Sequence, residues 1–279
     1  MDEPDVAAPP ITARLLAEGA GWRVQEVVCR SGPQDARFEE QHAWTSVAAV
    51  LSGIFTYRSA LGRAVLAPGA LMLGGVGHCF ECGHEHGAGD RCVSFHISPE
   101  LTEEIASGLK GARRAGFRRP SLPPIDRLAP LLAQARALAA SPDPLRAEQA
   151  AIAVTSLALA EDQDAALDRP TPREEACAVE AARIIEQRFA EPLSIAGLAT
   201  AVGLTRRRFA TAFRGALGVT PYHYILARRL EAAAERLAQG DAGVLEVALD
   251  CGFGDLSEFT RRFSARFGRS PGRWRRLRT

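Results

Sequence analysis

The chain has 279 residues, of which 47% are hydrophobic and 24% are charged, and its formal net charge is +1. This composition excludes a disordered chain, which needs low hydrophobicity or a large net charge. It also excludes a membrane-spanning protein, because the longest apolar stretches, Val47–Phe55 and Ala150–Ala160, are shorter than the roughly 18–20 residues that a span requires.

The length favours two domains, and the charge is divided unevenly between the two parts of the chain. The first 169 residues carry 16 basic and 21 acidic side chains, whereas the last 110 carry 18 basic and 12 acidic side chains. Such asymmetry indicates nucleic-acid contact by the basic part. The acidic start of the sequence lacks the features of an export signal, so we expect a cytoplasmic protein without membrane contact.

The region from Trp22 to about Pro99 has the pattern of a β-domain. Short apolar runs alternate with turn dipeptides such as Ser52-Gly53 and Pro68-Gly69. The expected strands are Val24–Cys29, Ala43–Ser52, Phe55–Arg58, Ala64–Leu66, Ala70–Leu73 and Arg91–Ile97. Closely spaced strands of this kind predict an antiparallel β-barrel or sandwich.

After Pro123 the pattern changes to helices, from about residue 124 to residue 162. The second of them, from about Pro144 to Asp162, is so rich in Ala, Val, Ile and Leu that we expect it to be buried. Packing against the barrel and packing against a second subunit both stay open. The proline-containing segment Asp168–Arg173 is a short linker. We therefore predict an α+β protein with one domain over residues 1–168 and a second, all-α domain over residues 173–279.

Two stretches of the second domain repeat one order of residues. A small residue precedes a glycine by four positions, and a helix-capping residue and an aromatic anchor follow. The two sets are Ala199, Gly203, Thr205 and Phe209, and Ala248, Gly252, Asp255 and Phe259. Closely crossing helices need a small side chain at the contact and tolerate glycine best in the turn. The repeat predicts two helix-turn-helix units joined by a long helix, Thr220–Gln239.

The geometry and charge of these units favour binding to double-stranded DNA. The joining helix is about 30 Å long at 1.5 Å per residue, close to the roughly 34–36 Å between successive major grooves on one face of DNA. The second helix of each unit is almost purely basic, with Arg206, Arg207, Arg208 and Arg214 in one and Arg261, Arg262 and Arg266 in the other. A solvated helix face would normally mix both signs of charge. We expect Phe209, Phe213, Phe253, Phe259, Phe263 and Trp274 to form the core.

The segment from Ala248 to Pro271 resembles the signature of the AraC/XylS family, and Phe213–Tyr222 is similar to the first unit of that family. The resemblance covers about residues 173–279. It implies a transcription regulator, with no enzyme activity, that binds promoter DNA; a homodimer and contact with RNA polymerase are also expected. The strand-rich N-terminal region is similar to the cupin-like sensing domain common in the family.

The resemblance also assigns roles to residues of the second helices. By position, the base-reading residues are Arg207, Ala210 and Thr211 in the first unit and Leu256, Ser257 and Arg261 in the second. Arg207 and Arg261 are each suited to a bidentate contact with guanine. Thr211 and Leu256 depart from the residues usual in the family. Phosphate contacts are expected from Arg206, Arg208, Arg214, Arg262, Arg266 and Arg273.

A loop between His78 and His96 holds four of the six histidines and three of the six cysteines. Cys82, His84, His86 and Cys92 form a two-sulfur, two-nitrogen set suited to zinc or another transition metal. Three interpretations stay open: metal binding, a thiol redox sensor whose cysteine pKa is lowered by neighbouring histidines, and a purely structural loop. No other cofactor is expected.

Two other functions compete with regulation by sequence-specific DNA binding. The histidines of the loop support an alternative, a metal-dependent cupin-type enzyme with an accessory nucleic-acid-binding domain. A structural nucleoid protein is the third hypothesis, and it would bind unrelated DNA sequences with equal affinity.

Overall fold

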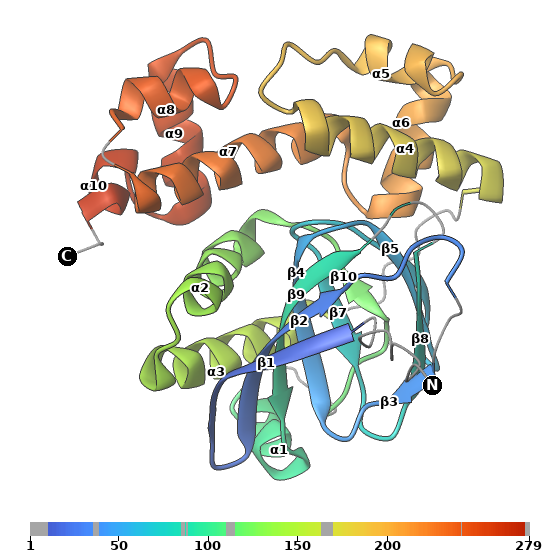
Figure 1. Cartoon of the computed structure of the whole chain (residues 1–279), viewed down its shortest axis with the longest axis vertical. Helices are drawn as coiled ribbons and strands as arrows, with labels where there is room; N and C mark the ends of the chain where they lie inside the picture. Colours follow the sequence, from blue (N-terminus) through green and yellow to red (C-terminus); the bar gives the residue numbers. More distant parts are fainter. Residues whose placement is uncertain are drawn as a thin grey trace, which may run out of the picture.

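The structure is a computed structural model that describes residues 11–35, 39–84, 87, 89–109, 115–162, 170–240 and 242–276. The N-terminal region combines antiparallel sheets with helices, and the C-terminal region is helical throughout (Figure 1). The predicted α+β organisation, with a sheet-containing region followed by an all-α region, is confirmed. Within the described part of the chain, no helix has both the length and the apolar character needed to cross a membrane.

Two antiparallel sheets build the N-terminal region. The larger sheet has the strand order β1-β2-β9-β4-β7-β10 and the smaller one the order β3-β8-β5-β6. The strands are β1 (Ile11–Gly19), β2 (Trp22–Cys29), β3 (Glu39–Gln41), β4 (Thr45–Ser52), β5 (Phe55–Ser59), β6 (Gly62–Leu66), β7 (Leu71–Gly74), β8 (Cys79–Gly83), β9 (Asp90–Ile97) and β10 (Ser121–Leu122). All six predicted strands are present. The sequence pattern missed β1, β3, β8 and β10, whose exposed or short segments give no clear apolar alternation.

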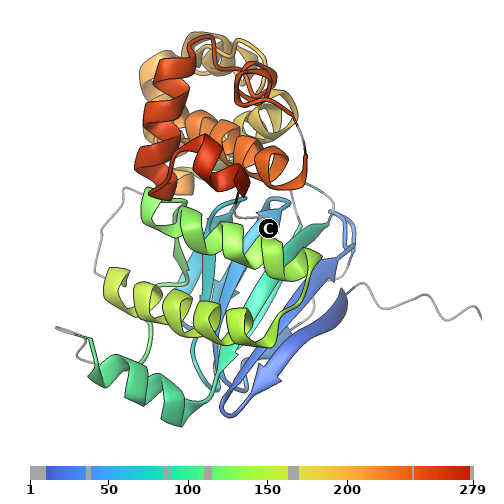
Figure 2. The ribbon, with the colours of Figure 1, turned by 90° about the vertical axis from the view of Figure 1, so that its left-hand side faces the viewer.

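Strand β4 shows why the larger sheet lies in the middle of this region. Successive side chains of a strand point to opposite faces, and a strand covered on both faces is apolar at nearly every position. Val47, Ala49 and Leu51 pack into the cluster that includes the helices, whereas Ala48 and Val50 pack toward the smaller sheet. The helices thus cover one face of the larger sheet, and the smaller sheet covers the other (Figure 2).

The helices of the N-terminal region are α1 (Pro99–Ser107), the short 3-10 helix η1 (Asp126–Leu128), α2 (Ala129–Ala140) and α3 (Pro144–Glu161). Helix α3 is buried along a stripe of small residues that includes Ala147, Ala151 and Ala158. This stripe packs into the same cluster as the larger sheet, so α3 is buried against its own domain. Leu145, at the start of α3, stays exposed.

The C-terminal region contains two consecutive pairs of helices of the same design. The helices are α4 (Pro172–Arg188), α5 (Ile195–Ala201), α6 (Arg206–Leu217), α7 (Pro221–Gln239), α8 (Val244–Asp250), α9 (Leu256–Phe267) and α10 (Pro271–Arg275). Helices α5 and α6 form the first pair and α8 and α9 the second, with α7 joining them. Helix α7 has 19 residues, which corresponds to about 28 Å.

The turns of the two helix pairs have the same backbone hydrogen-bond pattern. Gly203 and Gly252 have φ of +69° and +85°, a conformation that L side chains rarely adopt. The next amide in each turn donates to the carbonyl of the small residue in the preceding helix, from Leu204 to Ala199 and from Phe253 to Ala248, both at 2.9 Å. The repeated sequence pattern thus corresponds to a repeated backbone geometry.

The two regions are packed together by apolar contacts at both ends of α7. In the first pair, Phe213 and Leu217 share a cluster with Ile54 and Val65 of the N-terminal region. In the second pair, the α9 core shares a cluster with Ala129 of α2. The helical region therefore lies across one end of the sheet region, as Figures 1 and 2 both show.

We expect Gly252→Ala to destabilise the protein. An added Cβ would lie 2.6 Å from the carbonyl oxygen of Ala190, and an L residue at positive φ costs about 1–2 kcal/mol before this clash is counted. Urea unfolding of the full chain measures the loss. Gly254→Ala is the matched control, because a Cβ at Gly254 meets nothing within 4 Å. Equal unfolding midpoints for the two variants would contradict the argument.

Candidate functional site

The first pair of helices presents a basic surface at the start of α6. Thr205 caps this helix by accepting the amide of Arg208, and Arg206, Arg207 and Arg208 are exposed in its first turn. Phe209 and Phe213 lie on the opposite, buried side of the helix, with their rings 5.6 Å apart. The sequence thus separates an apolar face that holds the helix in place from a cationic face that is open to solvent.

The second pair repeats this arrangement at α9. Asp255 caps the helix, and Leu256, Ser257 and Arg261 are exposed. Phe259 and Phe263 are buried on the other side, 5.5 Å apart. All the predicted core aromatics of both units are buried, except Trp274, which is half-buried against Phe263 and Phe267.

The predicted base-reading residues lie on these outer faces. Arg207 and Thr211 are exposed, Ala210 between them is half-buried, and Leu256, Ser257 and Arg261 are exposed on α9. Within the described part of the chain, no acidic side chain pairs with Arg206, Arg207, Arg214, Arg261 or Arg273. Positive charge in the first turn of a helix opposes the helix dipole, so the arginines at the start of α6 do not stabilise that helix. A ligand with negative charge would account for them.

Two of the predicted phosphate-binding arginines form ion pairs at the surface of the protein. Arg208 lies 3.2 Å from Glu174 and keeps 68% of its side chain exposed. Arg262 lies 2.8 Å from Glu258 and donates to the hydroxyl of Tyr222 at 2.9 Å. Exposed pairs of this kind are worth only about 0–1 kcal/mol, so a phosphate could replace the carboxylate at little cost.

The phosphate role predicted for Arg266 does not fit the structure. Its side chain is 2% exposed, and its guanidinium group binds two carboxylates, those of Glu231 at 2.9 Å and Asp126. Asp126 belongs to the N-terminal region, and Glu231 is on α7. Arg266 is therefore held inside the molecule, where it joins α9 to the sheet region. The sequence pattern misplaced it because the basic run on α9 gives no indication that one arginine turns inward.

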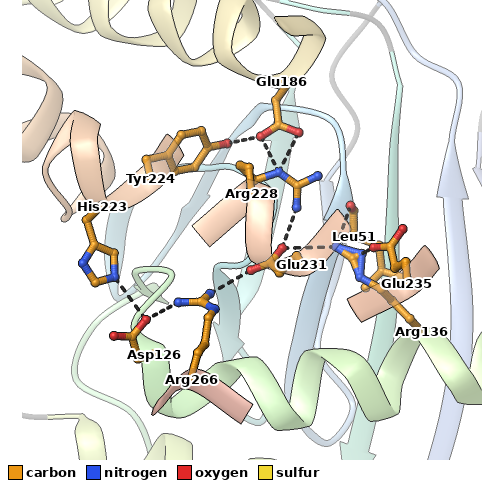
Figure 3. A network of polar contacts seen from close by, with 10 residues as sticks. All are labelled: Leu51, Asp126, Arg136, Glu186, His223, Tyr224, Arg228, Glu231, Glu235 and Arg266. Carbon is orange, nitrogen blue, oxygen red and sulfur yellow. Dashed lines mark hydrogen bonds and ion pairs between the residues drawn. The ribbon is translucent and has the colours of Figure 1, made fainter. Parts of the chain in front are cut away.

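The carboxylate of Glu231 is the centre of a network that Figure 3 shows from close by. Three arginines from three helices surround it: Arg228 of α7 at 2.5 Å, Arg266 of α9 at 2.9 Å and Arg136 of α2 at 3.5 Å. Arg136 also binds Glu235 at 2.7 Å and donates to the carbonyl of Leu51, at the end of β4. The network thus connects the sheet region with α7 and α9.

Three residues of α7, Tyr224, Arg228 and His223, connect this helix with α4 and η1. Arg228 and the hydroxyl of Tyr224 both bind Glu186 of α4, at 2.8 and 2.7 Å. His223 lies 3.3 Å from Asp126, which also binds Arg266. The hydrogen bond from His223, together with the charge of Arg266, holds the pKa of Asp126 below its usual value despite partial burial. The charged residues of α2, α4, α7, α9 and η1 therefore form one connected network of ion pairs.

The charge balance at Glu231 depends on all three arginines. Burial would raise the pKa of this carboxyl, but the guanidinium groups of Arg228, Arg136 and Arg266 outweigh burial and lower the pKa. Loss of one partner from a buried ion pair costs about 3–5 kcal/mol, because the remaining charge has no solvent to replace it. The network therefore fixes the position of α9 relative to α2.

A second candidate site is a cavity of about 500 Å³ in the N-terminal region. Both sheets line it, with His96 from β9 and Phe80 from β8 among the lining residues. The ring of His42 stacks on Phe80 with 4.1 Å between centroids, and its Nε2 lies 3.0 Å from the hydroxyl of Tyr57. Because Tyr57 donates to the carbonyl of Leu73, the Nε2 of His42 is placed to donate to Tyr57.

The histidines of the cavity are neutral at pH 7. Burial lowers the pKa of His42 to about 4, with smaller contributions from His96 and His78. Burial, together with the charge of Arg23, lowers the pKa of His96 to about 4 as well. Aromatic rings, neutral imidazoles and a few polar groups suit a small organic ligand with some hydrogen-bonding capacity.

The cysteine-histidine loop also borders this cavity, in a grouping that differs from the predicted one. His86 lies outside the described residues. His84 contacts Asp90, with 2.7 Å between Nε2 and Oδ2, and the Sγ of Cys29 lies within 4.8 Å of both. Neither Cys29 nor Asp90 was among the predicted ligands. Only the pairing of β2 with β9, which sets these two residues opposite each other, brings them together.

The two remaining predicted ligands, Cys82 and Cys92, line the cavity. The thiol of Cys92 donates to Asp90 at 3.4 Å. Burial, with a further contribution from the charge of Asp90, raises the pKa of both thiols. The redox interpretation assumed a lowered cysteine pKa, whereas burial raises the pKa at these two positions.

Glu231→Gln should destabilise the protein by about 3–5 kcal/mol, because it removes the one negative charge that three buried guanidinium groups share. Urea unfolding of the full chain measures the effect. Glu235→Gln is the matched control on the same helix, since Glu235 is 40% exposed and loses a single partner. The control should cost no more than about 1 kcal/mol. Similar losses in both variants would show that burial of Glu231 has no special importance.

The buried histidines predict a loss of stability in mild acid. Because their pKa is about 4 in the folded protein and 6.5 in the ordinary state, their stabilising effect is complete above pH 6.5 and decreases as the pH falls toward 4. Urea midpoints measured between pH 8 and pH 5 should therefore be level above pH 7 and fall below pH 6.5. The His42→Gln, His96→Gln double variant should show a smaller fall. An unchanged slope in that variant would assign the pH dependence to other groups.

A helix-turn-helix domain family matches residues 198–277 of the chain. The transcriptional regulator CdhR of Pseudomonas aeruginosa is 40% identical over 87 residues, which are 31% of this chain and 26% of CdhR. The TetD protein of transposon Tn10 from Escherichia coli is 37% identical over 92 residues, 33% of this chain and 67% of TetD. The chain thus spans only about a quarter of the length of a full regulator such as CdhR.

Among solved structures, a transcriptional regulator with an AraC-type DNA-binding domain from Chromobacterium violaceum is similar to 39% of this chain. The match covers 97% of that protein, with 29% identity and a TM-score of 0.36. The family match falls in the region of the two helix pairs. Through this C-terminal region, the chain belongs to the AraC/XylS family of transcriptional regulators.

Proposed function

We propose that the protein is a sequence-specific DNA-binding regulator of transcription whose N-terminal region senses a small molecule. The observation that carries this proposal is the pair of outward-facing helices α6 and α9. Each presents exposed arginines on one face and a buried aromatic row on the other. The family match to transcriptional regulators supports the same function.

In this proposal, α6 and α9 enter successive major grooves of promoter DNA. Arg207, Ala210 and Thr211 read bases from α6, and Leu256, Ser257 and Arg261 read them from α9. The guanidinium groups of Arg207 and Arg261 each suit the O6 and N7 acceptors of guanine. Ala210, Thr211 and Leu256 suit the methyl group of thymine, which is the only apolar group on the major-groove edge.

Phosphate contacts fix the register of the protein on DNA without reading sequence. We assign them to Arg206, Arg208, Arg214, Arg262 and Arg273. All of these are exposed or half-buried, and the two that carry carboxylate partners keep them on the surface. Arg266 is left out because its charge is already neutralised inside the molecule.

A continuous set of contacts runs from the cavity to α9. Ser46 and Ala48 of β4 line the cavity, and the last part of the same strand offers the carbonyl of Leu51 to Arg136. Arg136 binds Glu231, which binds Arg266 of α9. A ligand that binds one arrangement of β4 more tightly than another would shift the equilibrium between the corresponding positions of α9. The size of that shift is set by the difference in the ligand's affinity for the two arrangements. We propose this route for the response to the effector.

The remaining partners are part of the same proposal. A homodimer would bind two copies of the operator half-site, and exposed apolar residues of α3 such as Leu145 and Ile152 are available for subunit contact. RNA polymerase would be the protein partner at the promoter. The alternative of a cupin-type enzyme is less well supported, because the matched relatives are regulators of transcription.

Arg207→Ala and Arg261→Ala should each relax base preference at one position of the operator. Loss of a bidentate guanine contact costs about 1–3 kcal/mol, which corresponds to a fall in affinity of about fivefold to 150-fold for the preferred sequence. The operator is first selected from random DNA with the full chain. Gel-shift titrations then compare that sequence with single-base variants at one fixed salt concentration.

Arg183→Ala is the matched control. Arg183 is a partly exposed arginine of α4 that pairs with Glu180, outside both outward-facing helices. It should leave base preference unchanged. If the Arg207 and Arg261 variants discriminate among operators as the parent does, the base-reading assignment is wrong. Equal affinity of the parent for all DNA sequences would instead favour a nucleoid protein.

A further inference from the structure

We propose that Cys29, His84, Asp90 and Cys92 form a binding site for Zn²⁺ at one end of the cavity. A nitrogen, a carboxylate oxygen and a sulfur of the first three residues lie within 4.8 Å of one another. The sulfur of Cys92 lies outside this triad but only 3.4 Å from the other oxygen of Asp90, and in the proposal it turns in as the fourth donor. The set overlaps the predicted one at His84 and Cys92 and replaces Cys82 and His86.

The fold explains why these four residues meet. In the pairing of β2 with β9, Cys29 lies opposite Asp90 and Val27 lies opposite Cys92. Residues two apart on a strand share a face, so Asp90 and Cys92 point the same way, and Cys29 lies beside them on the neighbouring strand. His84 directly follows β8 of the smaller sheet. The site therefore bridges the two sheets at the place where the cavity ends.

The distances suit a tetrahedral metal. Zn²⁺ bonds of about 2.0–2.3 Å set neighbouring donor atoms roughly 3.3–3.8 Å apart. The contact between His84 and Asp90, at 2.7 Å, is shorter than this range, and every separation in the triad is within 4.8 Å. Binding of Zn²⁺ would therefore require the side chains of His84 and Asp90 to rotate apart.

The charge of Asp90 gives an independent reason to expect a cation. Its side chain is 8% exposed, and in the described part of the chain its only partners are the imidazole of His84 and the thiol of Cys92. A buried carboxylate needs a compensating positive charge, which among those residues neither arginine nor lysine supplies and His84 supplies only when it is protonated. A divalent ion would supply it, with the thiols of Cys29 and Cys92 each releasing a proton on binding.

The donor types select the metal. Thiolate and imidazole ligands favour zinc and related transition metals, whereas magnesium and calcium prefer sites made of oxygen atoms alone. Closed coordination by four protein ligands is typical of structural zinc rather than catalytic zinc. A metal here would clamp β2, β9 and β8 together and shape one wall of the cavity.

The test is metal binding by the full chain, purified under reducing conditions and stripped with a chelator. Titration with Zn²⁺ against a chromophoric chelator should give about one tightly bound ion per chain. Cys29→Ser and Cys92→Ser should each weaken binding at least about tenfold. Titration with Co²⁺ should give sulfur-to-metal charge-transfer absorption in the parent, at an intensity that indicates two thiolates, and about half that intensity in each variant.

Two further cysteine variants serve as controls. Cys79→Ser changes an exposed cysteine of β8 outside the group and should bind Zn²⁺ as the parent does. Cys82→Ser examines the predicted set, and it should also keep binding. Absence of Zn²⁺ uptake by the parent would overturn the proposal, as would loss of binding in Cys82→Ser with binding retained in Cys29→Ser. If a variant fails to fold, the Co²⁺ spectrum of the parent alone still decides, because a spectrum without thiolate absorption contradicts the site.

Discussion

The structure depends on one buried negative charge. The carboxylate of Glu231 is 4% exposed, and a charge so far from water is stable only with opposite charges around it. The three that surround it come from α2, α7 and α9, so the charge is balanced only when the sheet region, α7 and the second helix pair are in place. Apolar packing at Ala129 and Val65 brings the two regions together, and the ion network makes their relative position specific.

This requirement explains why one face of the helical region is neutralised and the other is not. The arginines near α2 are paired internally, whereas Arg206, Arg207 and Arg261 face solvent without carboxylate partners among the described residues. The same residue type thus stabilises the fold on one side and is free to bind an anion on the other. In the sheet region, the small and apolar side chains of β4 let helices and a second sheet pack on opposite faces, with the cavity between the sheets.

Local patterns were enough to predict most of the architecture. The six apolar strands, the helices after Pro123 and the two turns with Gly203 and Gly252 follow from periodicity, capping and backbone preferences within short segments. The misassigned residues all depend on contacts between distant segments. Arg266 looks like its neighbours on α9 until Asp126, 140 residues earlier, is placed beside it. Cys29 and Asp90 become neighbours only through the pairing of β2 with β9, which no local pattern specifies.

The inward position of Arg266 also changes how salt should act on the proposed complex with DNA. Each phosphate that a protein neutralises releases condensed counterions, and the logarithm of the affinity falls with the logarithm of salt concentration by about 0.9 per contact on duplex DNA. An arginine already matched by carboxylates releases none. The excess of basic residues in the C-terminal sequence is therefore larger than the number of arginines available to neutralise phosphates. The dependence of DNA affinity on ionic strength should reflect the exposed arginines alone.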